Sequence, residues 1–164
     1  MSSILNLDNN IIFNYNIINM KNKNIIFHED IAIADTAFTI KGKNESQLFE
    51  NAGKAFVMTM ADIIKVIPKL SKSIELHNKK LDILLFDFLN ELLFYKDSEG
   101  LLFSKFKVKI KRYKEMYILN ANIWGENVDP EKHRITTDIK AITMHMFKVV
   151  KKKDGYEARV VVDI

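Results

Sequence analysis

Residues 101–164 are a succession of strand patterns, and this feature most limits what the chain can fold into. In residues 101–110 apolar and charged residues alternate, which is typical of a strand with one face on a core. Further strands are predicted at residues 116–124, 135–144, 147–150 and 157–162, and Lys153-Asp154-Gly155 predicts a tight turn between the last two. Because short connections join antiparallel neighbours, the C-terminal half predicts an antiparallel sheet.

Two helices are predicted ahead of these strands. The first follows a strand at residues 31–40, begins at an Asn44 cap with Gln47 as its return partner, and ends before Pro68. It carries apolar residues at helical spacing: Leu48, Ala52, Ala55, Phe56 and Ile63. After a short strand at 73–77, the second helix runs from about Lys80 to Lys96 and stops at Gly100, with an apolar surface wide enough to be covered on more than one side. The expected fold class is α+β, a single domain of mostly antiparallel sheet with two main helices in the N-terminal half.

Composition limits the function classes. The chain has no cysteine, which excludes disulfide scaffolds and thiolate metal sites and fits a cytoplasmic protein. The net charge of +4 is too small to indicate nucleic-acid binding by itself. Residues 1–26 hold eight asparagines and seven isoleucines without a defensible period, so we expect a poorly ordered extension, and not a signal peptide or membrane span, before a domain at 27–164.

The usual catalytic motifs are missing from the sequence. It contains no glycine-rich phosphate loop, no Gly-x-Ser-x-Gly and no His-x-x-x-His. Its four histidines are scattered, and we interpret each as structural or solvated. Alternate lysines at 105–111 have two interpretations: contact with RNA phosphates, or the favoured one, the wet face of a strand kept basic to discourage edge pairing.

Two aspartates stand out from this background. Asp35 lies in an apolar strand pattern, and Asp163 lies at the end of another, beside the α-carboxylate of Ile164. A carboxylate in an apolar strand is costly unless it is paired or bound to a metal. Three such carboxylates would suit a hard cation such as Ca²⁺, Mg²⁺ or Mn²⁺. Sequence alone does not establish that the two strands are neighbours.

The chain resembles the archease family from about Glu29 to Ile164. The resemblance rests on an ordered set of short segments and on the way the chain ends. The segments are Ala34-Asp35, Ile40-Lys41-Gly42-Lys43, Leu48-Phe49-Glu50-Asn51-Ala52, Asn90-Glu91-Leu92-Leu93, Glu99-Gly100-Leu101-Leu102-Phe103-Ser104-Lys105-Phe106, Gly125-Glu126, Asp129-Pro130-Glu131-Lys132-His133, Ile139-Lys140-Ala141-Ile142-Thr143-Met144-His145 and Ala158-Arg159-Val160-Val161-Val162-Asp163-Ile164.

The resemblance implies a metal-binding accessory protein without catalytic residues of its own. Its expected partner is the GTP-dependent tRNA-splicing RNA ligase, which joins a 2′,3′-cyclic phosphate or 3′-phosphate end to a 5′-hydroxyl. The family promotes guanylylation of the ligase histidine and multiple turnover, so RNA contact would be indirect or weak, and no membrane is implied. Asp35, Asp163 and Ile164 match family positions that bind a divalent cation, expected to be Ca²⁺, with Mg²⁺ or Mn²⁺ as alternatives.

Other candidate functional residues surround this predicted site. Lys140 matches a family functional position, and we add Glu99 and His145. Many archeases carry His-Thr-Ala-Asp where this chain has Ala32-Ile33-Ala34-Asp35. The role of that histidine is therefore absent here or taken by another residue, such as His28.

Two further function classes stay open at this point. One is a small metal-dependent phosphoester hydrolase, with His145 or Glu99 as the base. The other is a chaperone-like or RNA-binding module that uses the alternate lysines, which steep salt dependence of RNA binding would mark.

Overall fold

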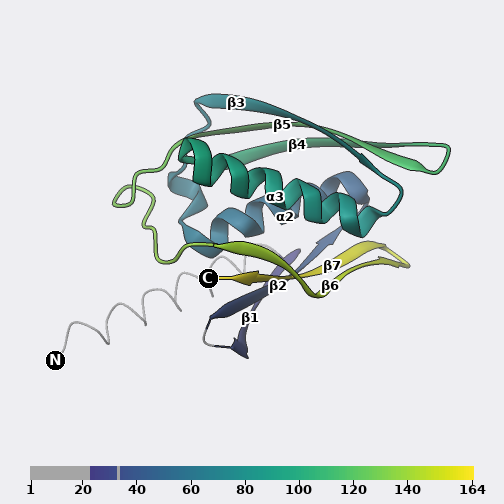
Figure 1. Cartoon of the computed structure of the whole chain (residues 1–164), viewed down its shortest axis with the longest axis horizontal. Helices are drawn as coiled ribbons and strands as arrows, with labels where there is room; N and C mark the ends of the chain where they lie inside the picture. Colours follow the sequence, from purple (N-terminus) through teal and green to yellow (C-terminus); the bar gives the residue numbers. More distant parts are fainter. Residues whose placement is uncertain (1–22, 33) are drawn as a thin grey trace.

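Two helices lie between two antiparallel sheets, so the described part of the chain has three layers (Figure 1). The computed structural model describes residues 23–32 and 34–164. The helices are α2 (Glu45–Met60) and α3 (Leu81–Glu99), with a 3₁₀ turn, η1 (Ile63–Lys65), after α2. The strands are β1 (Ile25–Ala32), β2 (Asp35–Gly42), β3 (Leu70–Asn78), β4 (Leu101–Tyr113), β5 (Met116–Asn127), β6 (Ala141–Lys152) and β7 (Gly155–Asp163).

The strands divide between a four-stranded sheet, in the order β1-β2-β7-β6, and a three-stranded sheet, in the order β3-β5-β4. All of these pairs are antiparallel, which confirms the predicted α+β class. Each helix touches both sheets: α2 packs on β2 and β4, and α3 packs on β3 and β6. The core therefore lies on both sides of the helical layer. The division into two sheets was not predicted.

Helix α3 confirms the prediction from its wide apolar surface. The buried side chains of α3 spread around the helix and include Leu84, Leu85 and Phe88. The Phe88 ring lies 5.7 Å from the ring of Phe49 in α2, measured between centroids. The helix ends at Gly100, whose φ of 63° is in the left-handed region that glycine adopts most easily. No helix among the described residues is long and apolar enough to cross a membrane.

Helix α2 begins as predicted and ends earlier than predicted. The Asn44 side chain accepts a hydrogen bond from the Gln47 N–H at 2.9 Å. The Gln47 side chain returns to the N–H of Lys43, one residue before the cap. The helix stops at Met60, and Ile63 belongs to η1, where Asp62 accepts the N–H of Ile64 at 3.2 Å. Apolar residues continue at helical spacing beyond Met60, so the sequence pattern predicts a longer helix. The helix ends there because the Asp62 side chain offers the backbone a local alternative hydrogen bond.

The predicted strand at residues 31–40 is corrected, because this segment holds the end of one strand and most of the next. β1 and β2 form a hairpin in which Ala32 pairs with Asp35 and Ile25 pairs with Ile40. No glycine or proline marks the reversal, so the apolar pattern runs through it. Asp35 therefore begins a strand instead of interrupting one. Residues 1–22 of the expected extension lie outside the described residues, and that prediction stays a prediction.

The two predicted strands at residues 135–144 and 147–150 are also corrected. A single strand, β6, begins at Ala141, and its register shifts between Thr143 and Lys148. Met146 within the shift has a φ of 52°, in the left-handed region. The bulge therefore requires a backbone conformation that glycine usually marks, and no glycine is present at this position. Residues 135–140 form a loop despite their β-branched content.

Candidate metal centre

The register of β2 against β7 places Asp35 directly opposite Asp163. The pairing then continues without a bulge to Gly42 opposite Tyr156. Directly opposite residues in antiparallel strands project from the same face and have Cβ atoms roughly 4.5–5.5 Å apart. The structure therefore brings together the two carboxylates that sequence alone could not show to be neighbours. We call them the aspartate pair.

The aspartate pair lies on the face of the four-stranded sheet that points away from the helices. Phe38 and Val160 belong to the core, and residues at odd positions of these two strands project the other way. On that outer face the next pair, Ala37 opposite Val161, is fully buried. Both aspartates are half-buried. The carboxylates thus sit beside apolar side chains, where a charge is less stable than in bulk water.

The end of the chain is held at the same place. The N–H of Ile164 donates to the carbonyl of Ala34 at 2.9 Å, and the N–H of Lys140 donates to the carbonyl of Asp163 at 2.8 Å. The Ile164 side chain also packs against the core. Residue 164 is therefore tied to the turn that precedes Asp35, and Figure 1 shows the C-terminal end of β7 beside the start of β2.

Two like charges facing each other across a strand pair destabilise it. At about 5 Å, two unit charges repel by roughly 1 kcal/mol in water and roughly 3 kcal/mol at the effective dielectric constant near a protein surface. Neither Asp35 nor Asp163 forms an ion pair with a described lysine, arginine or histidine. This uncompensated repulsion is what a cation would relieve.

The donor set limits which cation could fit. Among residues 23–32 and 34–164, no group of three or more histidine, cysteine, aspartate or glutamate side chains could hold a metal ion. The described side chains of these four types therefore supply no third ligand. Ile164, the third ligand position that the resemblance implies, follows Asp163 and is bonded to Ala34, so its backbone oxygens could complete the set. Such a set contains only oxygen donors, which Ca²⁺, Mg²⁺ and Mn²⁺ prefer.

Lys140 lies next to the aspartate pair. Its backbone is bonded to Asp163, the residue after it is paired with Asp163, and its side chain is exposed. The Lys140 side chain forms no ion pair with a described carboxylate and presents a positive charge at the edge of the site.

Lys96, which the sequence analysis did not single out, anchors the segment that carries Lys140. Its Nζ donates to the carboxylate of Asp138 and, at 3.0 Å, to the carbonyl of Ile139, and lies 2.7 Å from a carboxylate oxygen of Asp97. Burial lowers the pKa of the Lys96 ammonium, but its hydrogen bonds to Asp138 and Asp97 outweigh burial and raise that pKa above its ordinary value. The available signal was that Lys96 is the one basic residue of α3 and lies in its last turn.

Glu99 and His145 are not brought to the aspartate pair by any described contact. Glu99 is exposed at the end of α3 and forms an ion pair with Lys72 of the three-stranded sheet, at 2.5 Å. His145 is exposed in the β6 bulge, four residues past Ala141, which is the residue opposite Asp163. Four residues of extended strand span roughly 13 Å.

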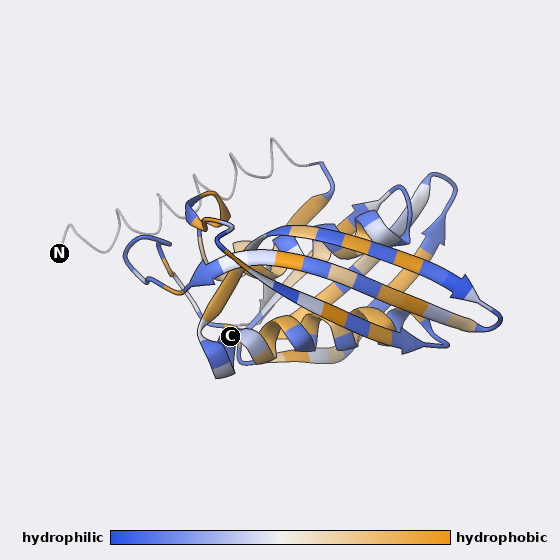
Figure 2. Ribbon diagram, turned by 90° about the horizontal axis from the view of Figure 1, so that it is seen from above, coloured by the Kyte–Doolittle hydropathy of each residue, from blue (hydrophilic) through white to orange (hydrophobic). Residues whose placement is uncertain are grey.

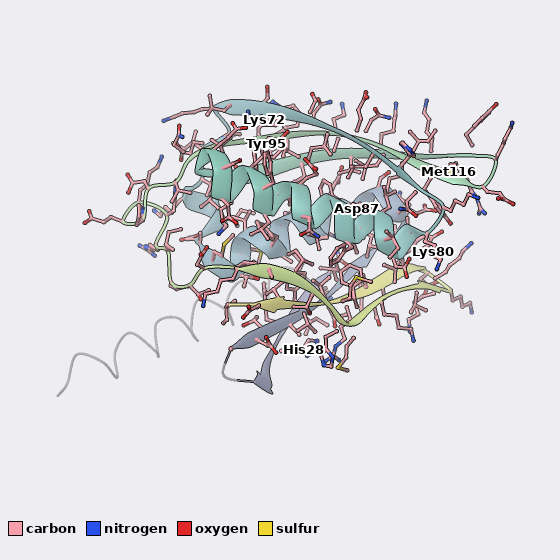
Figure 3. The ribbon with its side chains drawn as sticks, in the orientation of Figure 1. His28, Lys72, Lys80, Asp87, Tyr95 and Met116 are labelled. Atoms are coloured by element: carbon pink, nitrogen blue, oxygen red, sulfur yellow. The ribbon has the colours of Figure 1, made fainter. Side chains whose placement is uncertain are left out.

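The position of the family histidine falls beside the site. Ala32, which stands where many archeases have histidine, is paired with Asp35. His28 is on the same strand and points away from the helices, with its Nε2 at 2.8 Å from the Thr39 hydroxyl oxygen (Figure 3). His28 thus contacts Thr39 and has no described contact with Asp35.

Another carboxylate, that of Glu126, is buried near the end of β5. The sequence identified Glu126 only as part of the resemblance. Its Oε1 accepts hydrogen bonds from the Ile67 N–H at 2.8 Å, from Lys132 at 2.6 Å and from His133 at 2.9 Å. Lys69 lies 3.3 Å from the other oxygen. Burial would raise the pKa of Glu126, but these four donors hold it well below its ordinary value.

The tautomer of His133 follows from its partners. Its Nδ1 accepts the N–H of Asp129 at 3.0 Å, so the ring hydrogen is on Nε2, which donates to Glu126. His133 is fully buried, which favours the structural over the solvated interpretation of this histidine. We call Glu126 and its four donors the Glu126 network. It ties the loop after β5 to the segment between η1 and β3.

Fold and site together define a class of small α+β proteins in which two sheets enclose a helical layer and one sheet end gathers carboxylates. The Archease protein family model (MTH1598/TM1083) matches residues 27–164. The chain belongs to the archease family.

Individual relatives agree with this assignment. Protein archease of Pyrococcus furiosus is 38% identical over 132 residues, which cover 80% of this chain and 93% of the relative. Protein archease of Sulfurisphaera tokodaii is 39% identical over 131 residues, with the same coverage. The solution structure of Methanobacterium thermoautotrophicum protein 1598 superimposes with a TM-score of 0.77 at 34% identity, covering 87% of this chain and 100% of that one. The predicted fold is thereby confirmed.

Proposed function

We propose that this protein is an accessory factor that activates an RNA ligase. The ligase would join a 2′,3′-cyclic phosphate or 3′-phosphate end to a 5′-hydroxyl, and the factor would promote guanylylation of the ligase and its multiple turnover. We further propose that a divalent cation, Ca²⁺ in the first instance, binds at the aspartate pair. Membership of the archease family supports the ligase as the partner.

The observation that carries the cation part of this proposal is the direct opposition of Asp35 and Asp163. The side-chain carboxylates and the α-carboxylate of Ile164 would hold the ion, and the ion would supply the positive charge that offsets their repulsion. The protein backbone positions these ligands. Ile164 is bonded to Ala34 and Asp163 to Lys140, so the three candidate ligands come from backbone that is already ordered.

The same end of the molecule provides a surface suited to an activator. An accessory factor needs a rigid arrangement to present to its partner, and two ionic clusters hold the loops here. Lys96 holds residues 138–139, and the Glu126 network holds the loop after β5. We propose that the chain end, the turn before Asp35 and Lys140 face the ligase.

A ligation assay tests the proposal. A purified RNA ligase of this type, with GTP and an RNA pair bearing 3′-phosphate and 5′-hydroxyl ends, is assayed with and without the protein under multiple-turnover conditions. Wild type should raise the yield per ligase at least tenfold, and Asp35→Ala and Asp163→Ala should each abolish the increase. Asp154→Ala, which removes an exposed carboxylate at the β6-β7 turn, serves as the matched control.

Circular dichroism and thermal unfolding establish that the variants are folded. If wild type has no effect on ligation, the proposed function is wrong. If either site variant activates normally, the function stands and the cation site is wrong. Turnover of phosphate esters by the isolated protein would indicate the hydrolase alternative instead.

A further inference from the structure

The outer face of the three-stranded sheet carries an uninterrupted line of positive charge. In β4 the alternation predicted from the sequence is confirmed: Phe106 and Val108 are buried, and the lysines between and beyond them are exposed. We call the four exposed lysines the lysine column. They are Lys105, Lys107, Lys109 and Lys111. Figure 2 looks down on this sheet and shows hydrophilic and hydrophobic residues alternating along its strands.

No carboxylate among the described residues neutralises the charges of the lysine column. Alternate residues of a strand lie about 6.8 Å apart on one face, so the column spans roughly 20 Å. No lysine of the column forms an ion pair with a described carboxylate. On the far strand, β3, the residues in register with this face include one acid, Glu75. An extended polyanion is the partner whose charge spacing such a column fits.

The neighbouring strand presents a different kind of surface. The β5 residues directly opposite the lysine column are all uncharged: Trp124, Asn122, Asn120 and Ile118. Opposite charges directly across two strands stabilise a sheet, and such pairs are absent at these four positions. The Lys105 Nζ lies 4.8 Å from the centre of the Trp124 ring instead. Aromatic rings, amides and cations on one sheet are the groups that bind single-stranded nucleic acid.

Protection of the sheet edge explains only part of this surface. β4 is an edge strand, and lysines discourage pairing with another chain. β5 lies in the centre of the sheet and has no free edge. Edge protection therefore accounts for charge on β4 and leaves the uncharged, partly aromatic line on β5 unexplained.

We propose that the outer face of the three-stranded sheet binds single-stranded RNA, with phosphates along the lysine column and a base against Trp124. The choice of RNA over other polyanions rests on the proposed function. The aspartate pair is on the other sheet, across the helical layer, so RNA and cation would occupy separate faces (Figure 1).

Trp124 provides a direct readout, because it is the one tryptophan of the chain. The isolated protein is titrated with a single-stranded RNA of roughly ten nucleotides, within the usual site size of such surfaces. The tryptophan emission should change saturably, with a Kd in the range of about 10⁻⁴ to 10⁻⁶ M expected for phosphate-driven binding. Four phosphate contacts predict a slope of about −3 for log K against log salt concentration.

A matched pair of triple variants tests the lysine column. Lys107→Gln/Lys109→Gln/Lys111→Gln should weaken RNA binding at least tenfold and flatten the salt slope by about 2, since three contacts are lost. Lys151→Gln/Lys152→Gln/Lys153→Gln removes the same charge from the β6-β7 hairpin of the other sheet and should leave both values nearly unchanged. Replacing the same three β4 lysines by arginine keeps the charge and should preserve binding.

Several results would overturn the proposal. The first is a tryptophan emission that does not change on addition of RNA. The second is an equal loss of RNA affinity in the two glutamine variants. The third is a β4 glutamine variant that binds RNA like wild type but aggregates or loses ligase binding. The last result would assign the column to edge protection or to an acidic protein partner. No ligase or cation is present in the titration, and Asp35→Ala should bind RNA normally, so failure here is distinguishable from failure of the proposed function.

Discussion

Glu126 and the aspartate pair are two regions that take carboxylates out of water, and they treat the negative charge in opposite ways. Glu126 is surrounded by a backbone N–H, two lysines and a histidine. Asp35 and Asp163 face each other, with no described cationic partner. The Glu126 network is therefore complete without a ligand and belongs to the fold, whereas the aspartate pair is incomplete and is where we expect a ligand.

Removing charge from the two regions should have effects of opposite sign. Deleting the charge of Glu126 weakens the hydrogen bonds that it accepts and leaves Lys69 and Lys132 without their counter-charge, which is costly. Deleting one charge of the aspartate pair relieves repulsion as long as no cation is bound.

The largest effect is expected for Glu126→Gln. It should destabilise the fold by roughly 2–3 kcal/mol, because hydrogen bonds to a charged group are weakened or lost. For a chain of this size the midpoint of thermal unfolding should fall by about 5–10 °C. Differential scanning calorimetry measures it, and Glu131→Gln, which alters an exposed acid in the same loop, is the control. An unchanged midpoint would contradict a structural role for the Glu126 network.

The Glu126 network also predicts a pH dependence. Because the folded pKa of Glu126 is lowered, its stabilisation is fully present above the ordinary value of 4.5 and is lost as pH falls towards the lowered folded value. Wild-type stability should therefore decline below about pH 4.5 more steeply than that of Glu126→Gln. Unfolding midpoints from about pH 7 to pH 3 would show parallel curves if this assignment is wrong.

The next effect concerns cation binding to the aspartate pair. At a free Ca²⁺ concentration of about 100 times its Kd, wild type should gain roughly 2.7 kcal/mol of stability relative to the same protein in chelator. Asp163→Asn should gain clearly less, because one ligand has lost its charge. Glu126→Gln should gain as much as wild type although it is less stable throughout. A full gain by Asp163→Asn would remove Asp163 from the ligand set.

A C-terminal tag should have a smaller effect. Adding residues after Ile164 replaces its carboxylate by a neutral peptide carbonyl, while the Ile164 side chain keeps its packing on the core. Ligand charge helps set the affinity of hard-cation sites, so we expect about tenfold weaker binding, or roughly 1.4 kcal/mol. Calorimetric titration with Ca²⁺, Mg²⁺ and Mn²⁺ measures this. An N-terminal tag is the control, and equal affinities would exclude the terminal carboxylate.

The smallest expected effect is a gain in stability when one charge of the aspartate pair is removed without a cation, opposite to the loss expected at Glu126. In chelator, Asp163→Asn should be more stable than wild type by about 0.2–1 kcal/mol, the range of cross-strand charge pairs. Chemical denaturation at low ionic strength measures it, because salt screens the repulsion. A clear loss of stability would mean that a partner outside the described residues already neutralises the pair.

What could be predicted from sequence here was local. The Asn44 cap, the Gly100 stop, the exposed lysines of β4 and the wide apolar surface of α3 all follow from neighbours within a few residues. The hairpin between β1 and β2 and the bulge of β6 carry no glycine or proline signal, so periodicity missed both. The Glu126 network joins segments that are far apart in sequence, and no local pattern encodes such a partnership.

The aspartate pair lies between these cases. The resemblance to archeases predicted its members, but their opposition depends on the register of two strands from opposite ends of the domain. That register is a consequence of the whole four-stranded sheet, with β7 bonded to β2 on one side and β6 on the other. It could be obtained only from the fold.

Because the pairing between β2 and β7 has no bulge, the site depends on whether an odd or an even number of residues is inserted into the strand. Side chains alternate between faces with a period of two, so one residue inserted between Asp35 and Gly42 would send either the carboxylate or the core residues to the wrong side. Two inserted residues would restore the side but displace the carboxylate by about 6.8 Å along the strand. Lineages of this fold that keep the aspartate pair should therefore conserve the number of residues between Asp35 and Gly42 more strictly than their identity.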